Sequence, residues 1–147
     1  LSLAGERKGT EARFFGHGDV ASLEGRLQRV PPEKAAMVVV DGVFSMSGQG
    51  APLPDIPALC RRYGARLVVD DAHGLGVLGQ GRGTAAHHGC TDEVDVIVGT
   101  FSKSLAATGG FVAGPREVIQ WLQHFARPFI FTASLPAATS PAYARTP

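Results

Sequence analysis

Three short apolar runs constrain the fold of this chain more than any other feature of its sequence. They cover residues 36–40, 67–69 and 94–98, and each is followed at once by polar residues or glycine. Apolar runs of this length are typical of strands that are buried on both faces of a parallel sheet. A helical pattern over residues 53–63 separates the first two runs. Strand, helix and strand at this spacing predict a βαβ unit with parallel strands and a right-handed crossover.

Turn and cap residues set the bounds of the other predicted elements. Asp19 is an N-cap type, and it opens a predicted helix over residues 20–29 that the following prolines stop. In the helix over residues 53–63, Pro57 has to lie in the first turn to be tolerated. Residues 110–113 follow the third run after only about ten residues, too few for a parallel crossover, so we expect an antiparallel strand there.

A last helix is predicted to open after Gly114 and Pro115 and to end before Pro128. Its apolar stripe should face a core, and the single tryptophan should pack there too; these residues are Val118, Ile119, Leu122, Phe125 and Trp121. Residues 129–134 then show a second change from apolar to hydroxyl side chains. Together the elements predict an α/β fold: three-layer, with a mostly parallel sheet flanked by helices.

Charge and composition exclude several classes of protein. The formal charge of +1 gives no basic surface for nucleic acid, and the apolar runs are too short for a transmembrane segment. Cys60 and Cys90 have no CxxC pairing and no histidine at metal-ligand spacing, which predicts reduced thiols, no metal site and a cytoplasmic location. Because the chain lacks an initial Met and ends just after a turn signal, we expect residues 1–147 to be one partial domain.

A single lysine, Lys103, follows the third apolar run within the stretch VGTFSKSLAATGG. A phosphate-binding P-loop requires glycine directly before its lysine, and Ser102 stands there instead, so the P-loop interpretation fails. An amine held at a sheet edge among neutral side chains can lose its proton, because desolvation disfavours the charged form, and a neutral amine forms Schiff bases. Lys103 is therefore either a covalent anchor or an ordinary solvated lysine.

A second polar cluster follows the run at 67–69, where residues 70–73 (Asp-Asp-Ala-His) lead into a glycine-rich segment. Ligands of open α/β sheets bind beyond the carboxyl ends of the strands, so Asp70 and His73 lie where chemistry is expected; an Asp-Gly turn is the alternative. Ser45 follows the first strand in the same way. Pyridoxal 5'-phosphate requires a lysine for its Schiff base, a carboxylate for its ring nitrogen and neutral donors for its phosphate. The three strand ends offer this set.

Four segments in order carry a family resemblance: DGVFSMSGQGAPL, LVVDDAHGLGVLGQGRG, VGTFSKSLAATGGF and RPFIFTASLP. They resemble the signatures of the α-oxoamine synthases, pyridoxal-phosphate enzymes of the aspartate-aminotransferase fold, and are most similar to the bacterial serine palmitoyltransferase and aminooxononanoate synthase branches. The resemblance implies the large domain of that fold, incomplete at both ends and without the small C-terminal domain. It also implies a homodimer that catalyses a decarboxylating Claisen condensation of an amino acid with an acyl-CoA.

The same resemblance implies roles around one cofactor. Lys103 would form the Schiff base and move the substrate α-proton, Asp70 would pair with the pyridine nitrogen, and His73 would contact the ring oxygen. The residues expected near the cofactor or its phosphate are Ser45, Thr100, Ser102 and, from the neighbouring subunit, Thr132.

The chain departs from the family pattern at several positions. Asp41 replaces a glutamate, Ser47 an aspartate and Gly18 an asparagine, while Ala106 stands where glycine is common and Ala137 where a second proline is expected. The ring-stacking histidine of the family lies outside these residues. An aminotransferase with the same cofactor and an inactive fragment that only dimerises remain as alternatives. A nucleotide-driven motor is disfavoured because the chain has no P-loop.

Overall fold

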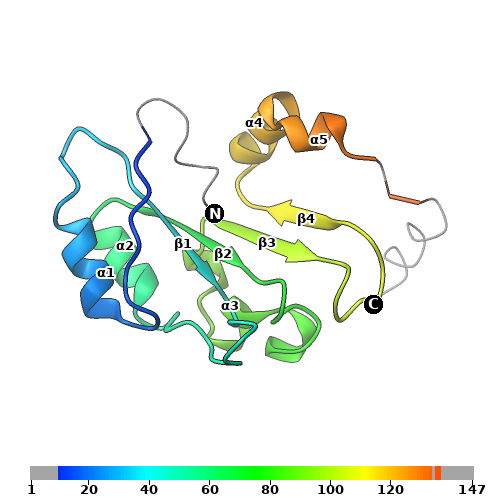
Figure 1. Cartoon of the computed structure of the whole chain (residues 1–147), viewed down its shortest axis with the longest axis horizontal. Coiled ribbons are helices and arrows are strands. Elements are labelled where there is room, and N and C mark those ends of the chain that lie inside the picture. Colours follow the sequence, from blue (N-terminus) through cyan, green and yellow to red (C-terminus); the bar gives the residue numbers. More distant parts are fainter. Residues whose placement is uncertain (1–9, 134, 137–147) are drawn as a thin grey trace.

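The structure is a computed structural model that describes residues 10–133 and 135–136. Figure 1 shows its strands side by side, with α1 and α2 beside β1 and with α4 and α5 beside β4. In chain order the main elements are α1 (Val20–Leu27), β1 (Met37–Asp41), α2 (Ile56–Arg62), β2 (Arg66–Asp70), α3 (Thr84–His87), β3 (Val96–Thr100), β4 (Gly110–Ala113), α4 (Arg116–Phe125) and α5 (Arg127–Phe131). Two 3-10 turns, η2 (Gly79–Gly81) and η3 (Thr91–Glu93), flank α3.

The sheet has the order β1-β2-β3-β4. The pairs β1–β2 and β2–β3 are parallel, and β3–β4 is antiparallel. This confirms the predicted βαβ unit, the antiparallel fourth strand and the fold class, a mostly parallel sheet flanked by helices. The register places Asp41 opposite Asp70 and Asp70 opposite Val98, so the parallel strands end together at one edge of the sheet.

Caps and turns bound the helices as the sequence predicted. The Asp19 side chain accepts a hydrogen bond from Ser22 N at 2.8 Å, which caps α1. Pro57 lies in the first turn of α2, where its missing N–H leaves no hydrogen bond unmade. Gly64 ends the following turn with a φ of +64°, a left-handed conformation that glycine adopts without steric cost.

The core lies on one face of the first two strands. Alternate strand residues point to this face and are buried with the apolar sides of α1 and α2; the core residues of these four elements include Val38, Val40, Leu67, Val69, Leu23, Leu27, Ile56 and Leu59. The other residues of the strands, such as Val39 and Val68, are only half-buried. In the described part of the chain, the second face of the sheet is therefore less completely covered than the first.

The predicted packing of the α4 stripe is wrong for this chain. No residue of α4 is buried, and Trp121 is 56% exposed, with its ring centroid 5.3 Å from that of Phe125. The stripe has helical spacing, but no described element covers it. Residues 129–131 belong to α5, which has Pro128 in its first turn, and Ser134 lies outside the described residues. Among the described helices, none has the length and apolar character that crossing a membrane requires.

Candidate functional site

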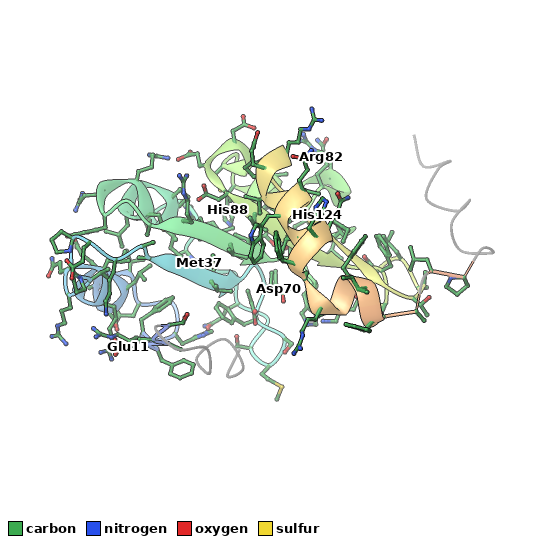
Figure 2. All side chains as sticks on the ribbon, turned by 90° about the horizontal axis from the view of Figure 1, so that it is seen from above. Glu11, Met37, Asp70, Arg82, His88 and His124 are labelled. Atoms are coloured by element: carbon green, nitrogen blue, oxygen red, sulfur yellow. The ribbon has the colours of Figure 1, made fainter. Side chains whose placement is uncertain are left out.

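The predicted site residues follow the carboxyl ends of the parallel strands. Asp70 is the last residue of β2 and is the register partner of Asp41 in β1. Register partners point to the same face, so both carboxylates lie on the sheet face opposite the core. Figure 2 shows Asp70 at the other end of the strands from Met37. Asp70 is half-buried, and its Oδ1 accepts a hydrogen bond from Ala72 N at 3.2 Å.

His73 and Lys103 come together from two different strand ends. The distance between Lys103 Nζ and His73 Nε2 is 2.6 Å. His73 belongs to the turn after β2, and Lys103 to the loop after β3. At this distance the amine and the imidazole share a hydrogen bond, whose donor depends on their protonation. The structure thus groups an amine, an imidazole and, at the same sheet edge, the Asp70 carboxylate.

The loop around Lys103 is more open than the sequence predicted. Lys103 is an exposed residue, although its amine contacts His73. The reason is geometric, because β3 ends at Thr100 and the lysine lies beyond the sheet edge. The expected desolvation therefore requires a group that binds over the lysine.

Two hydroxyl groups lie beside the lysine in this loop. Thr100 Oγ1 and Ser102 Oγ are 2.8 Å apart, and Thr100 Oγ1 also donates to the Gly109 carbonyl at 3.2 Å. Ala106 has a φ of +49°, in the left-handed region that favours glycine. This conformation explains physically why glycine suits the position where the sequence has Ala106.

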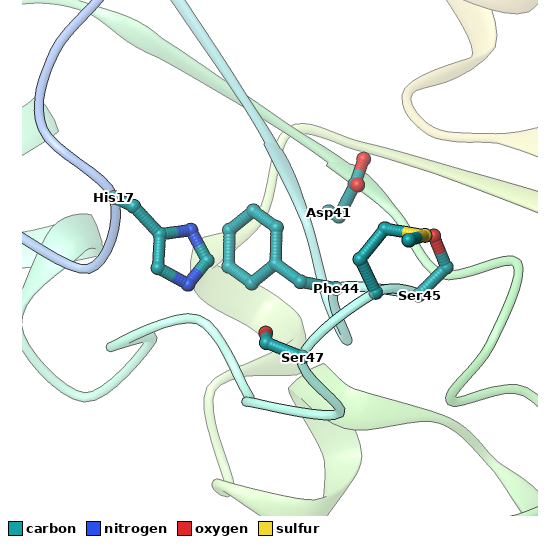
Figure 3. Close-up of a pocket in the computed structure, with 6 residues that line it drawn as sticks. His17, Asp41, Phe44, Ser45 and Ser47 are labelled. Atoms are coloured by element: carbon teal, nitrogen blue, oxygen red, sulfur yellow. The ribbon is translucent and has the colours of Figure 1, made fainter.

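Ser45 lines a shallow hollow of about 260 Å³ at the end of β1, together with His17, Asp41, Phe44, Met46 and Ser47 (Figure 3). His17 packs edge-on against Phe44, with ring centroids 4.2 Å apart, and its Nε2 is 2.7 Å from Gln49 Oε1. These contacts tie the segment before α1 to the Ser45 loop. Among the described residues, no hydrogen bond joins Ser45 to the His73 and Lys103 pair.

Thr132 is the predicted site residue that follows α5. Its side chain is exposed, and its backbone N–H donates to the Pro128 carbonyl at 3.0 Å. Within the described part of the chain, no hydrogen bond connects Thr132 with the other predicted site residues. Ala137, which replaces an expected proline, lies outside the described residues.

Sequence reasoning missed a buried polar pair next to the site. Asp71 adjoins Asp70 in the sequence, yet its carboxylate points into the protein and accepts hydrogen bonds from Thr84. The alternation of β2 contains a signal for this difference: Asp70 continues the half-buried face of Val68, so the next side chain starts toward the other face. The role of Thr84 has no such signal in the sequence.

The residues at the edge suit pyridoxal phosphate in their chemistry. Among the described residues, Asp70 Oδ2 accepts no hydrogen bond, which leaves a carboxylate oxygen for a cationic ring N–H. Thr100 and Ser102 are neutral hydroxyl donors suited to a phosphate. Lys103 supplies an accessible amine. The donor set therefore fits the group that the sequence predicted.

The fold and this site belong to a known class of protein. The chain is a member of the aminotransferase class I and II family, whose model matches residues 7–147.

Its relatives are of the two kinds that the sequence resemblance indicated. A serine palmitoyltransferase from Bacteroides ovatus is 54% identical over 130 residues, which are 87% of this chain and 33% of that protein. An 8-amino-7-oxononanoate synthase from Thermoanaerobacter pseudethanolicus is 46% identical over 127 residues, which are 85% of this chain and 32% of that protein.

Solved structures agree with these sequence relatives. A serine palmitoyltransferase variant from S. paucimobilis, with a bound pyridoxal phosphate–myriocin aldimine, has a TM-score of 0.78 and 43% identity. The match covers 83% of this chain and 31% of that one. The chain therefore spans about a third of the length of the curated relatives that it matches.

Proposed function

We propose that the protein is a pyridoxal-phosphate-dependent acyltransferase of the α-oxoamine synthase kind, which condenses an amino acid with an acyl-CoA and releases carbon dioxide. Residues 1–147 would form part of its cofactor-binding large domain. The names and identities of both kinds of relative support this proposal. The 54% identity to a serine palmitoyltransferase favours that branch.

One observation carries the proposal. Lys103 Nζ lies 2.6 Å from His73 Nε2 at the edge where β2 also presents Asp70. A lysine that only served solubility would be expected to point into solvent, away from an imidazole on another loop. Open α/β sheets bind their ligands beyond this end of the strands, so the grouping lies where a bound ligand is expected.

The proposed residues would hold the cofactor from several sides. Lys103 would hold it covalently through Nζ, Asp70 would pair with its ring nitrogen, and His73 would bind its ring oxygen. When bound, pyridoxal phosphate supplies an electron-accepting ring next to the α-carbon of the amino acid. The neutral hydroxyl groups proposed around it are those of Ser45, Thr100, Ser102 and, from the neighbouring subunit of a homodimer, Thr132.

Lys103 would do the proton chemistry, with His73 and Asp70 in supporting roles. The Lys103 amine would act as a base toward the α-proton of the bound amino acid and would later return a proton. His73 can orient this amine, because the two nitrogens already lie within hydrogen-bonding distance. The Asp70 carboxylate would pair with the cationic ring nitrogen, which would favour electron withdrawal from the α-carbon.

The proposal is tested with Lys103→Ala in the intact protein. We expect the unsubstituted protein to be yellow with pyridoxal phosphate and to lose this colour on borohydride reduction, because a Schiff base absorbs visible light and is reducible. Lys103→Ala should abolish both properties. Lys34→Ala, which removes an exposed lysine far from Lys103 in the sequence, should keep them. Unchanged colour and bleaching in Lys103→Ala would contradict the assignment of Lys103 as the Schiff-base lysine.

Aminotransferase activity uses the same lysine and aspartate, so a second measurement separates the two reactions. The proposed condensation consumes a thioester and releases free CoA, whereas an aminotransferase converts a keto acid without a thioester. Release of CoA that depends on both an amino acid and an acyl-CoA supports the proposal. Transamination without CoA release would favour the alternative.

The two cysteines support the proposed cytoplasmic location. Cys60 and Cys90 are both free and both buried in the core. Free thiols are typical of proteins kept in a reducing compartment.

A further inference from the structure

The carboxylate that follows Asp70 in the sequence is buried, and the proposed chemistry does not use it. Asp71 is 2% exposed and Thr84 is 0% exposed. The Thr84 hydroxyl donates to Asp71 Oδ1 at 2.5 Å, and the Thr84 backbone N–H donates to Asp71 Oδ2 at 2.7 Å. One residue at the start of α3 therefore satisfies both oxygens of a buried carboxylate.

Three glycines from separate segments enclose this pair. A Cβ atom at Gly42, Gly74 or Gly83 would lie 2.5, 2.3 or 2.0 Å from an Asp71 oxygen. Gly42 follows β1, Gly74 follows His73, and Gly83 directly precedes Thr84. Backbone packs closely around the carboxylate on every one of these sides, so Asp71 has little freedom to adopt another position.

Hydrogen bonds connect the pair to both loops of the candidate site. Asp71 N donates to the Val98 carbonyl at 2.7 Å, which joins the end of β2 to β3. Leu75 N donates to the Asp71 carbonyl at 3.0 Å, and the Leu75 carbonyl accepts the Ser104 hydroxyl at 2.6 Å. Ser104 directly follows Lys103, so a continuous path of contacts runs from Asp71 to the lysine loop.

We propose that Asp71 and Thr84 form a positioning pair for the cofactor site. Their buried hydrogen bonds hold the turn of residues 71–75, so that Asp70 and His73 face the lysine loop. Asp71 touches neither cofactor nor substrate in this arrangement and acts only through its neighbours. The inference rests on the proposed function, since the residues that it positions are those proposed to hold pyridoxal phosphate.

The experiment compares Thr84→Val with Thr84→Ser in the intact protein. Valine keeps the shape of threonine but removes the donor to Asp71 Oδ1, whereas serine retains it. We expect Thr84→Val to weaken pyridoxal phosphate binding about tenfold, the lower end of the loss in metal affinity when a hydrogen-bond partner of a metal ligand is removed. It should also change the visible circular dichroism of the bound cofactor at saturation. Thr84→Ser should restore both properties.

A core variant separates positioning from plain loss of stability. Leu59→Ala removes a buried side chain of α2 and should destabilise the protein without touching the Asp71–Thr84 pair. Its urea midpoint is compared with that of Thr84→Val, so that the two variants can be judged at similar stability. A Thr84→Val protein with the cofactor affinity and dichroism of Leu59→Ala would overturn the proposal. If Thr84→Val does not fold, Asp71→Asn carries the same comparison, because its amide has no negative charge and only one oxygen to accept the two hydrogen bonds that Thr84 donates to the carboxylate.

The two proposals fail in different ways. If the unsubstituted protein holds no pyridoxal phosphate that borohydride can trap, the proposed function fails and the positioning role falls with it. If the unsubstituted protein holds the cofactor and the variants bind it unchanged, only the positioning role is wrong.

Discussion

Two regions of the molecule differ in how completely their apolar side chains are covered. In the region of α1, β1, α2 and β2, Leu53, Leu67 and Val69 are 0% exposed. In β4, α4 and α5, no described residue is buried, and Phe131 is 81% exposed. The first region has a packed core, and the second presents an apolar surface.

The candidate site lies where these two regions meet. Asp70 and His73 come from the packed region, where the Asp71–Thr84 pair and the enclosing glycines fix the turn that carries them. Lys103 comes from a loop that leads into the open region, and its side chain is exposed. The proposed contacts to the cofactor ring are thus built into this chain, whereas the surroundings of the lysine depend on what binds over it.

The largest expected effect contrasts one apolar residue from each region. Leu67→Ala should lower the free energy of unfolding by about 2–5 kcal/mol, because it leaves a cavity in the core. Phe125→Ala should lower it by less than about 0.5 kcal/mol, because that ring is already exposed. Urea unfolding of the intact protein measures both. Similar losses would show that α4 is covered in the intact protein.

A pair of glycines tests how tightly the packed region holds Asp71. Gly83 and Gly89 both have a positive φ, and Gly83 also has a ψ of −177°, so alanine at either position is strained and should lower the free energy of unfolding by about 1–3 kcal/mol. Gly83→Ala should lower the free energy of unfolding by about 1–3 kcal/mol more than Gly89→Ala does. The new Cβ atom at position 83 would lie 2.0 Å from Asp71 Oδ2, whereas a Cβ atom at position 89 would have nothing within 4 Å. Thermal or urea unfolding compares the variants, and equal losses would mean that the Asp71 site is loosely packed.

The buried thiols make the packed region sensitive to high pH. Burial, and then the Asp95 carboxylate, raise the pKa of Cys60 to about 11 from 9.0, while Arg61 acts against them. Burial also raises the pKa of Cys90. As pH rises between about 9 and about 11, the unfolded state loses a Cys60 proton that the folded state keeps, so stability falls. The slope is at most about 1.4 kcal/mol per pH unit for one thiol.

Urea midpoints measured across this pH window check the slope in the unsubstituted protein and in Cys60→Ala. The variant should lose less stability with rising pH than the unsubstituted protein does. An identical slope in both proteins would contradict the assignment to Cys60.

The smallest expected effect lies in the lysine loop. Ala106 has a φ of +49°, so Ala106→Gly should relieve backbone strain and raise the free energy of unfolding by about 0.5–1 kcal/mol, after the greater freedom of glycine in the unfolded chain is subtracted. Ala107→Gly is the matched control, because its φ is not in that region, and it should lower stability instead. A loss in both variants would mean that the loop is not strained.

Much of the arrangement could be predicted from the sequence because it follows from local rules. The apolar runs predicted the three parallel strands, and the short link before residues 110–113 predicted the antiparallel pairing of the fourth strand. The meeting of His73 with Lys103 follows from parallel strands ending at one edge. In each case the pattern of neighbouring residues determines the outcome.

Other features depend on packing that the sequence does not display. The helical stripe with Trp121 predicted a buried face, but burial requires a covering element, and no described residue provides one. Likewise, the Asp71 carboxylate finds its hydrogen-bond donors on Thr84, which lies thirteen positions further along the chain. Lys103 is exposed because it lies beyond the end of β3, where, among the described residues, no strand or helix encloses it.

Peptide mapping after borohydride reduction tests the proposed covalent anchor most directly. The intact protein is incubated with pyridoxal phosphate, reduced and digested, and the modified peptides are identified by mass spectrometry. We predict a pyridoxyl group on Lys103 in stoichiometric amount, with Lys8 and Lys34 unmodified. A label spread over the lysines, or one confined to Lys8 or Lys34, would contradict the assignment of Lys103 as the anchor.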